Sequence, residues 1–366
     1  MANIRHVLGI SGGKDSAALA IYMKDKYPNL DIEYYTSDTG KELDETYQLI
    51  ENLKIYLGKP IQILKGAEGS HLDPFDHFLQ SYGGYLPSSM SRWCTKKLKL
   101  EPFEKYVGDD LVVSYVGIRG DEDREGYISR RSNIQSIFPY RQNIWSEDVI
   151  SKFLSFDLEK AVALTDIVDL GKNKADFIDV LAKEVTPRYN QQSKLTDLFD
   201  KGVKATNYLI FEFLKTTSYP LAKESDFPLL DNEDVIVRDD VFKILEESGV
   251  GVPSYYKKVD FEIGGKKGQY SRSRSGCYFC FFQQKIEWVW LYEQHPDLFQ
   301  KALEYEKEGY NWNQKESLSE LTKPERIKQI KVEYIKRQER STSVKSQYLL
   351  DILDDSESEG CAACFI

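Results

Sequence analysis

Short apolar runs, each followed by a polar turn, alternate with helix-like stretches in the first third of the chain. Residues 4–10 form a strand-length run, and residues 17–23 then have the apolar character of a mostly buried helix. Strands that alternate with helices predict an α/β fold, in which a parallel twisted sheet carries helices on both faces. The further strands expected are residues 32–36, 61–64 and 111–118.

Two more helices are expected between these strands. The first presents an apolar stripe and ends at Gly58, because glycine is favoured at helix C-termini; the second is shorter and covers residues 75–79. The stripe of the first helix consists of Leu43, Tyr47, Ile50, Leu53 and Leu57.

The pattern changes after about residue 145, where helical segments rich in Leu, Phe and Lys replace the strands until about residue 235. A polar, basic loop is expected at residues 264–275, and helices at 239–247, 285–294, 296–307 and 324–336. We therefore divide the chain into an α/β domain (1–145), a helical insertion (146–236), a cysteine-containing helical C-terminal region (237–345) and a flexible acidic tail (346–366) that ends in CAACFI.

The composition is that of a soluble globular chain. Among 366 residues, 49 are Lys or Arg and 59 are Asp or Glu, which gives a net charge of −10, and 41% are hydrophobic. These values exclude a wholly disordered or collagen-like protein. No apolar run approaches the roughly 18 residues that cross a bilayer, and the N-terminus lacks the pattern of a signal peptide. We expect a cytoplasmic protein that makes no membrane contact.

Five cysteines are too few for a disulfide scaffold in a chain of this length. Cys277 and Cys280 form one C-x-x-C, Cys361 and Cys364 form another, and Cys94 stands alone. This clustering predicts metal or redox chemistry in a reducing compartment.

Three polar turns follow predicted strands, at residues 11–16, 38–40 and 117–124. In open parallel sheets, ligands bind beyond the carboxyl ends of the strands. The sequence therefore predicts that these turns converge on one cleft.

The first of these turns has the residues expected of a phosphate-binding loop. Its glycines allow the backbone to approach a ligand, and the N–H groups of the following helix favour an anion. The spacing differs from that of the Walker loop. An ordinary strand-to-helix turn is the alternative. The loop consists of Ser11, Gly12, Gly13, Lys14, Asp15 and Ser16.

This loop resembles the pyrophosphate-binding loop of the N-type ATP pyrophosphatases (the PP-loop superfamily), and within them the phosphoadenosine phosphosulfate reductase-like family. The resemblance covers about residues 1–145 and residues 273–283, and leaves out the insertion and the tail. True sulfonucleotide reductases usually alter the loop and lose its Lys, so the intact loop favours ATP cleavage. The other matching stretches are TSDTGKE (36–42), RWCTKKLK (92–99), GIRGDEDR (117–124) and SRSGCYFCFFQ (273–283).

The resemblance implies that ATP and Mg²⁺ bind at the cleft, and that a substrate oxygen attacks the α-phosphate and releases pyrophosphate. It implies that the first loop holds the pyrophosphate and that Asp15 orients the loop or the metal. Asp38 would lie near the nucleotide or its metal, unless it caps the following helix. Arg119 and Arg124 would contact phosphate or substrate, unless they pair with Asp121, Glu122 or Asp123. The implied nucleotide-binding set also includes Thr39, Gly40 and Gly117.

The cysteines have several interpretations. Cys277 and Cys280 alone could be half of a metal site, a redox dithiol or two buried small residues. Together with Cys94 they resemble the three cysteines that hold a [4Fe-4S] cluster in tRNA-thiolating enzymes, and iron-sulfur is favoured over zinc because no histidine is nearby. The tail pair could deliver a persulfide or reducing equivalents, supply a fourth ligand, or have no catalytic role.

The function expected is ATP-dependent adenylation coupled to sulfur transfer onto a nucleic acid, DNA or tRNA. DNA phosphorothioation and tRNA thiolation enzymes are the nearest analogies, and the former would suit phage defence. A sulfur donor such as a cysteine desulfurase, and a homo- or hetero-oligomer, would be partners. Residues 323–345, with eight Lys or Arg against three Glu, and residues 266–274 could track a phosphate backbone, or form an ordinary solvated surface. The alternatives are a thiol-dependent sulfonucleotide reductase and a non-catalytic nucleotide-sensing module of a defence complex.

Overall fold

The central element is a five-stranded parallel sheet. The computed structural model describes residues 4–122, 129, 131–307, 309–313 and 316–343. The order β3-β2-β1-β4-β5 places β1 in the middle, and every neighbouring pair is parallel, which confirms the predicted α/β class. The strands are β1 (Arg5–Gly9), β2 (Ile32–Asp38), β3 (Ile61–Lys65), β4 (Val112–Tyr115) and β5 (Ile134–Ile137).

Successive side chains of a strand point to opposite faces of the sheet. Because apolar side chains point to both faces here, helices cover both. Leu8 packs in the cluster that contains the apolar side chains of α1 (Lys14–Lys26) and α2 (Asp44–Leu57). The preceding residue, Val7, packs on the other face against Phe103 of α5 (Glu101–Val107). Short helices α3 (Pro74–Ser81) and α4 (Trp93–Thr95) and a π-helical turn (Lys96–Leu100) precede α5.

The predicted end of α2 is confirmed, but one residue of its stripe was assigned wrongly. Gly58 has φ +65° and donates its N–H to the Lys54 carbonyl, as a C-terminal glycine should. Tyr47 is 38% exposed instead of buried. Its hydroxyl donates to Asp38 and Glu42, so the ring lies beside the end of β2 and outside the core.

The helical region predicted after residue 145 is present, and it packs against the sheet. Trp145 belongs to the same apolar cluster as Leu8, and its indole N–H donates to Asn207 at 2.9 Å. A 3₁₀ turn (Pro220–Lys223) contacts β4 and β5, and α11 (Arg238–Glu247) contacts α1. The helices between are α6 (Glu147–Leu154), α7 (Leu158–Leu164), α8 (Lys174–Ala182), α9 (Gln191–Lys201) and α10 (Val203–Leu214).

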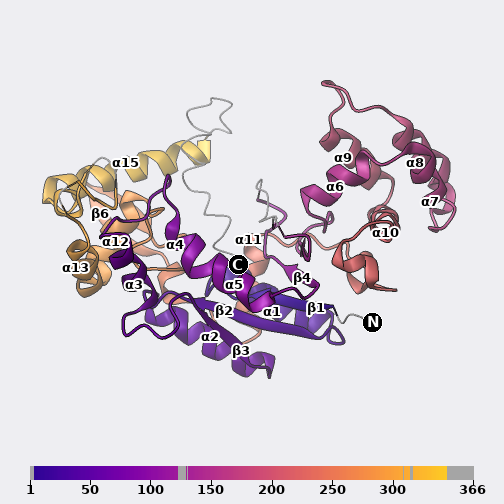
Figure 1. Cartoon of the computed structure of the whole chain (residues 1–366). Coiled ribbons are helices and arrows are strands. Elements are labelled where there is room, and N and C mark those ends of the chain that lie inside the picture. The colour runs from indigo at the N-terminus through magenta and orange to yellow at the C-terminus, as the bar shows by residue number, and fades with distance from the viewer. Residues whose placement is uncertain (1–3, 123–128, 130, 308, 314–315, 344–366) are drawn as a thin grey trace.

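The C-terminal region lies on the opposite side of the sheet from α6–α10 (Figure 1). After α11, it contains a hairpin of β6 (Val259–Ile263) and β7 (Lys266–Tyr270). The prediction of a loop over residues 264–275 was therefore wrong for β7: the chain turns at Gly264 and Gly265, which have positive φ, and Phe261 packs on Tyr270. The helices that follow are α12 (Lys285–Gln294), α13 (Pro296–Glu304), α14 (Leu318–Leu321) and α15 (Pro324–Ser343).

None of the helices in the described part of the chain is long and apolar enough to cross a membrane. The division of the chain into four domains stays a prediction. The expected acidic tail lies outside the described residues.

The buried His6 on β1 should make stability depend on pH. Its Nδ1 lies 2.8 Å from the Tyr115 hydroxyl, and burial lowers the pKa of His6 from 6.5 to about 4. The unfolded chain thus binds this proton more readily than the folded chain does. The contribution of the neutral His6 side chain to the free energy of unfolding is complete above pH 6.5. It decreases by at most about 3 kcal/mol as the pH falls toward 4.

Urea unfolding at pH 7 and pH 5 measures this effect. We expect His6→Gln to reduce the loss of unfolding free energy between the two pH values, and His71→Gln, at an exposed position, to leave it unchanged. An equal loss in wild type and His6→Gln would contradict the assignment.

Candidate functional site

The first predicted turn lies at the carboxyl end of the central strand β1, immediately before α1. The Ser11 N–H donates to the Ser16 hydroxyl at 3.1 Å, and that hydroxyl donates to the Gly13 carbonyl at 3.2 Å. Gly12 has φ +73°, and a Cβ there would lie 2.2 Å from Cγ2 of Thr46. Only glycine fits this position, because a side chain would be strained and would also collide with α2.

A network of buried charges surrounds the start of α1. The Lys14 ammonium lies 2.7 Å from one oxygen of Asp15, and the Arg119 guanidinium lies 2.7 Å from the other. Arg119 also pairs with Asp121 at 2.8 Å and with Glu122 at 2.6 Å, so the pairing considered from the sequence is observed, in addition to the contact with the loop. Burial lowers the pKa of Lys14; burial also opposes ionisation of Asp15, but the Lys14 and Arg119 charges hold the Asp15 pKa below its usual range.

Gly117 places the third predicted turn, after β4, against this network. A Cβ at Gly117 would lie 3.0 Å from the Asp15 carbonyl oxygen, so the chain after β4 passes directly beside α1. Arg124, the other predicted phosphate ligand, lies outside the described residues.

Residues from the C-terminal region cover the first loop. Tyr255 donates its hydroxyl to the Gly12 carbonyl at 3.0 Å, and the Tyr256 hydroxyl accepts the Lys14 N–H at 3.3 Å. A Cβ at Gly13 would lie 2.7 Å from the Ser275 hydroxyl. The side chain of Lys14 is therefore buried. Sequence reasoning missed Tyr255 and Tyr256, which stand about 240 residues after the loop; the resemblance did include Ser275.

The turn after β2 lies at the same edge of the sheet. Asp38 accepts the Gly40 N–H at 2.9 Å and the Tyr47 hydroxyl at 3.0 Å, and it does not cap α2, which begins at Asp44. Thr39 donates its hydroxyl to Glu42 at 2.5 Å. Burial and the charge of Asp38 raise the pKa of Glu42, a residue that sequence reasoning left out of the site.

The first C-x-x-C pair reaches this turn. The Cys277 sulfur lies 3.2 Å from the Thr39 hydroxyl, and the Tyr278 N–H donates to the Lys41 carbonyl at 2.9 Å. Burial raises the pKa values of the Cys277 and Cys280 thiols.

Cys94 and Cys277 pack at the edge of one apolar cluster. Within the described ranges, however, no three His, Cys, Asp or Glu side chains are grouped closely enough to hold a metal ion. No such group in the described ranges contains Cys94, Cys277 and Cys280, and their role as cluster ligands stays a prediction. The tail cysteines are not described.

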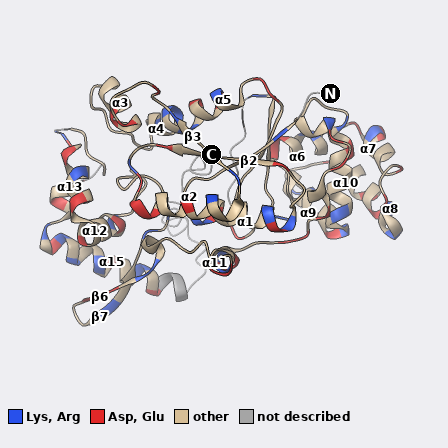
Figure 2. Ribbon diagram, turned by 90° about the horizontal axis from the view of Figure 1, so that it is seen from below, with Lys and Arg blue, Asp and Glu red and all other residues tan. Residues whose placement is uncertain are grey.

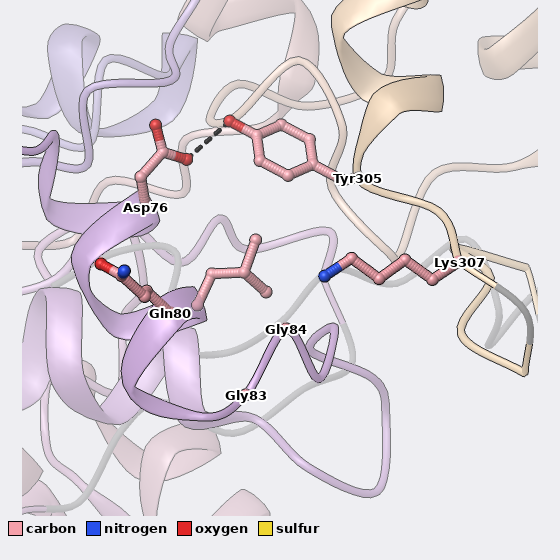
Figure 3. Close-up of a pocket in the computed structure, with 7 residues that line it drawn as sticks. Asp76, Gln80, Gly83, Gly84, Tyr305 and Lys307 are labelled. Carbon is pink, nitrogen blue, oxygen red and sulfur yellow. Dashed lines mark hydrogen bonds between the residues drawn. The ribbon is translucent and has the colours of Figure 1, made fainter.

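Beside this edge, a cavity of about 410 Å³ opens between α3 and the segment after α13 (Figure 3). Lys41 lies 3.0 Å from Asp73 and 2.7 Å from Asp76, and Tyr305 donates to Asp76 at 2.6 Å. The Lys307 side chain extends toward Gly84 across the cavity. These residues connect the turn after β2 to the C-terminal region.

The basic segments considered for nucleic-acid binding hold several internal ion pairs. Lys266 of β7 pairs with Glu339, Lys331 of α15 with Glu293 at 2.6 Å, and Arg326 with Glu316 at 2.8 Å. Acidic and basic positions are interspersed over α12, α13 and α15 (Figure 2). Contact with a nucleic acid stays a prediction.

Parts of the chain are similar to known proteins, including the following three. An uncharacterized protein of Methanocaldococcus jannaschii is 31% identical over 153 residues, which are 38% of this chain and 30% of that protein. An uncharacterized nin region protein of Escherichia phage lambda is 28% identical over 145 residues, 32% of this chain and 49% of that protein. The argininosuccinate synthase of Shewanella baltica is 26% identical over 208 residues, 51% of this chain and 48% of the synthase.

The chain thus spans less than half the length of each of these relatives. No family model matches the sequence, and no solved structure matches it. The likeness to argininosuccinate synthases, together with the parallel sheet, supports the PP-loop ATP pyrophosphatase superfamily. It does not support the narrower reductase-like family.

The close fit of Gly12 against α2 can be tested by substitution. We expect Gly12→Ala to lower the free energy of unfolding by about 3 kcal/mol, because positive φ and a collision with Thr46 act together. Gly58→Ala is the matched control, since Gly58 also has positive φ but a Cβ there would meet nothing within 4 Å. This substitution should lower the free energy of unfolding by only about 1 kcal/mol. Equal losses in denaturant unfolding would contradict the fit.

Proposed function

We propose that this protein binds ATP with Mg²⁺ at the first loop and transfers the adenylyl group to an acceptor oxygen. The acceptor oxygen forms a bond to the α-phosphorus, the bond from the α-phosphorus to the bridging oxygen breaks, and pyrophosphate leaves. The observation that carries the proposal is the glycine loop at the carboxyl end of β1, with Lys14 and Arg119 on either side of Asp15. Likeness to an ATP-using superfamily supports it.

The residues of the loop have distinct roles in this proposal. The N–H groups at the start of α1, the hydroxyls of Ser11 and Ser16, and Lys14 bind the β- and γ-phosphates. Asp15 is a positioning residue, because it holds Lys14 and Arg119 at fixed distances. Arg119 contacts a phosphate or the acceptor.

The carboxylate of Asp38 and the serine hydroxyls are oxygen donors of the kind that Mg²⁺ prefers. Asp38, whose side chain is 19% exposed, lies at the same sheet edge as the loop and would hold the metal through the nucleotide or water. When bound, Mg²⁺ neutralises charge on the phosphates.

We further propose that sulfur replaces the adenylated oxygen, with loss of AMP, and that the acceptor is a nucleic acid. The motifs that resemble the reductase-like family support this, as does Cys277, which lies against Thr39 at the nucleotide edge. A donor such as a cysteine desulfurase would supply the sulfur as a protein persulfide. The outer sulfur forms a bond to the adenylated centre, the bond from that centre to the adenylated oxygen breaks and AMP leaves with the oxygen, and a thiol reductant then cleaves the remaining S–S bond. A [4Fe-4S] cluster on Cys94, Cys277 and Cys280 stays a prediction, and no step here depends on it.

Replacing Lys14 tests the adenylation proposal. With labelled ATP and candidate DNA or tRNA acceptors, wild type should release pyrophosphate and AMP, and Lys14→Ala should lower the rate at least about 100-fold. The fold should persist because Asp15 keeps its pairing with Arg119. Lys54→Ala, at an exposed position on α2, should keep full activity.

Unchanged turnover by Lys14→Ala would contradict the role of the loop. Tight ATP binding without AMP formation from any acceptor would favour the nucleotide-sensing alternative. Sulfite release from an adenylyl sulfate substrate would favour the reductase alternative.

Metal analysis after anaerobic purification tests the cluster. We expect Cys277→Ala to lose any bound iron because one of the three predicted ligands is removed. A variant that retains its full iron or zinc content would contradict the ligand set.

A further inference from the structure

Arg272 is a buried cation without a counter-ion in the described part of the chain. Its side chain is only 1% exposed. One guanidinium nitrogen, Nη2, donates to the Cys277 carbonyl at 3.1 Å, and the guanidinium lies 5.9 Å from the centre of the Tyr255 ring. The other two nitrogens, Nε and Nη1, are buried with no hydrogen-bond partner among the described residues.

Such an arrangement is unfavourable in the free protein. Burying a charge costs free energy unless a partner of opposite charge and hydrogen bonds compensate for it. Other arginines of this fold have that compensation: Arg5 pairs with Glu33 and Asp110, and Arg119 pairs with Asp15. The unmatched donors of Arg272 therefore indicate a site for an anion that the described residues do not supply.

Arg272 belongs to the segment that covers the first loop. Its own N–H donates to the Tyr255 carbonyl at 2.9 Å, and the Tyr255 hydroxyl donates to Gly12. Three residues further on, Ser275 lies against Gly13. One aromatic ring thus separates the unmatched guanidinium from the glycines of the loop.

The charge balance at the loop gives the second argument. Lys14 and Arg119 are both neutralised by carboxylates in the free protein. Binding of a triphosphate adds several negative charges, and Arg272, on the segment that covers the loop, has two buried nitrogens with no hydrogen-bond partner among the described residues.

We infer that Arg272 binds a phosphate oxygen in the pyrophosphate part of the nucleotide. This inference rests on the proposed function and adds to the site a residue from a distant part of the sequence. The contact requires Tyr255 and the 272–277 segment to shift when the nucleotide binds. A phosphate oxygen that accepts from Nε and Nη1 removes the cost of leaving these groups unpaired, which favours the shifted arrangement.

A purely structural role predicts the opposite effect on stability. If Arg272 serves only to hold Cys277 and Tyr255 in place, its replacement should destabilise the free protein. If it is an unmatched ligand-binding cation, an apolar side chain of similar length should stabilise the free protein and weaken binding.

The experiment compares wild type, Arg272→Met and Arg272→Lys by thermal unfolding without ligand and by calorimetric titration with Mg²⁺-ATP and with inorganic pyrophosphate. Arg272→Met should raise the Tm by a few degrees and lower the affinity for each of the two ligands at least about tenfold. Arg272→Lys should recover part of the affinity because it restores the charge.

Arg5→Met is the matched control, because Arg5 forms ion pairs with Glu33 and Asp110 and lies at the end of β1 that is away from the first loop. It should lower the Tm and leave both affinities unchanged. A fall in the Tm of Arg272→Met, or unchanged affinity for pyrophosphate, would overturn the inference while the proposed function stands. Absence of ATP binding in wild type would overturn the proposed function itself.

Discussion

The ion network at the start of α1 sets the geometry of the whole candidate site. Lys14 and Asp15 are 6% and 5% exposed, and buried charges of this kind persist only where partners compensate for their desolvation. Asp15 supplies that compensation by holding Lys14 on one oxygen and Arg119 on the other. The network therefore joins the first loop to the turn after β4, and it fixes two cations at the carboxyl edge of the central strand.

The C-terminal region completes this edge from a distance of more than 200 residues. Tyr255 and Tyr256 contact Gly12 and Lys14. The backbone of Cys277 forms an isolated antiparallel β-bridge with Glu42, close to Thr39. The loop is covered in the free protein as a result. Under the proposed function, nucleotide binding requires movement of this covering segment, because the segment occupies the hydrogen-bonding groups of Gly12 and Lys14.

Much of the sheet could be predicted from the sequence, since β1, β2, β3 and β4 are apolar runs followed by polar turns. The strand β5 escaped prediction because two of its four residues, Gln135 and Ser136, are polar although they are buried. The hairpin strand β7 has the composition of a loop (KKGQY), and its pairing with β6 depends on the turn at Gly264 and Gly265.

The site was predictable only in its local parts. A glycine loop after a strand indicates phosphate binding from a few adjacent residues. The side chains that cover it are set by the tertiary packing of a remote segment, which no local pattern records. Arg272 shows this difference most clearly: in the sequence it is one of several basic residues in a polar stretch, and only its burial without a carboxylate partner among the described residues distinguishes it.

The central claim, that the first loop binds a triphosphate, is tested most directly by a crystal structure of the protein with Mg²⁺ and a non-hydrolysable ATP analogue. Our account predicts density for the β- and γ-phosphates within hydrogen-bonding distance of the N–H groups at the start of α1, with Tyr255 and Tyr256 displaced. Analogue bound elsewhere, with these two tyrosines still against Gly12 and Lys14, would contradict it.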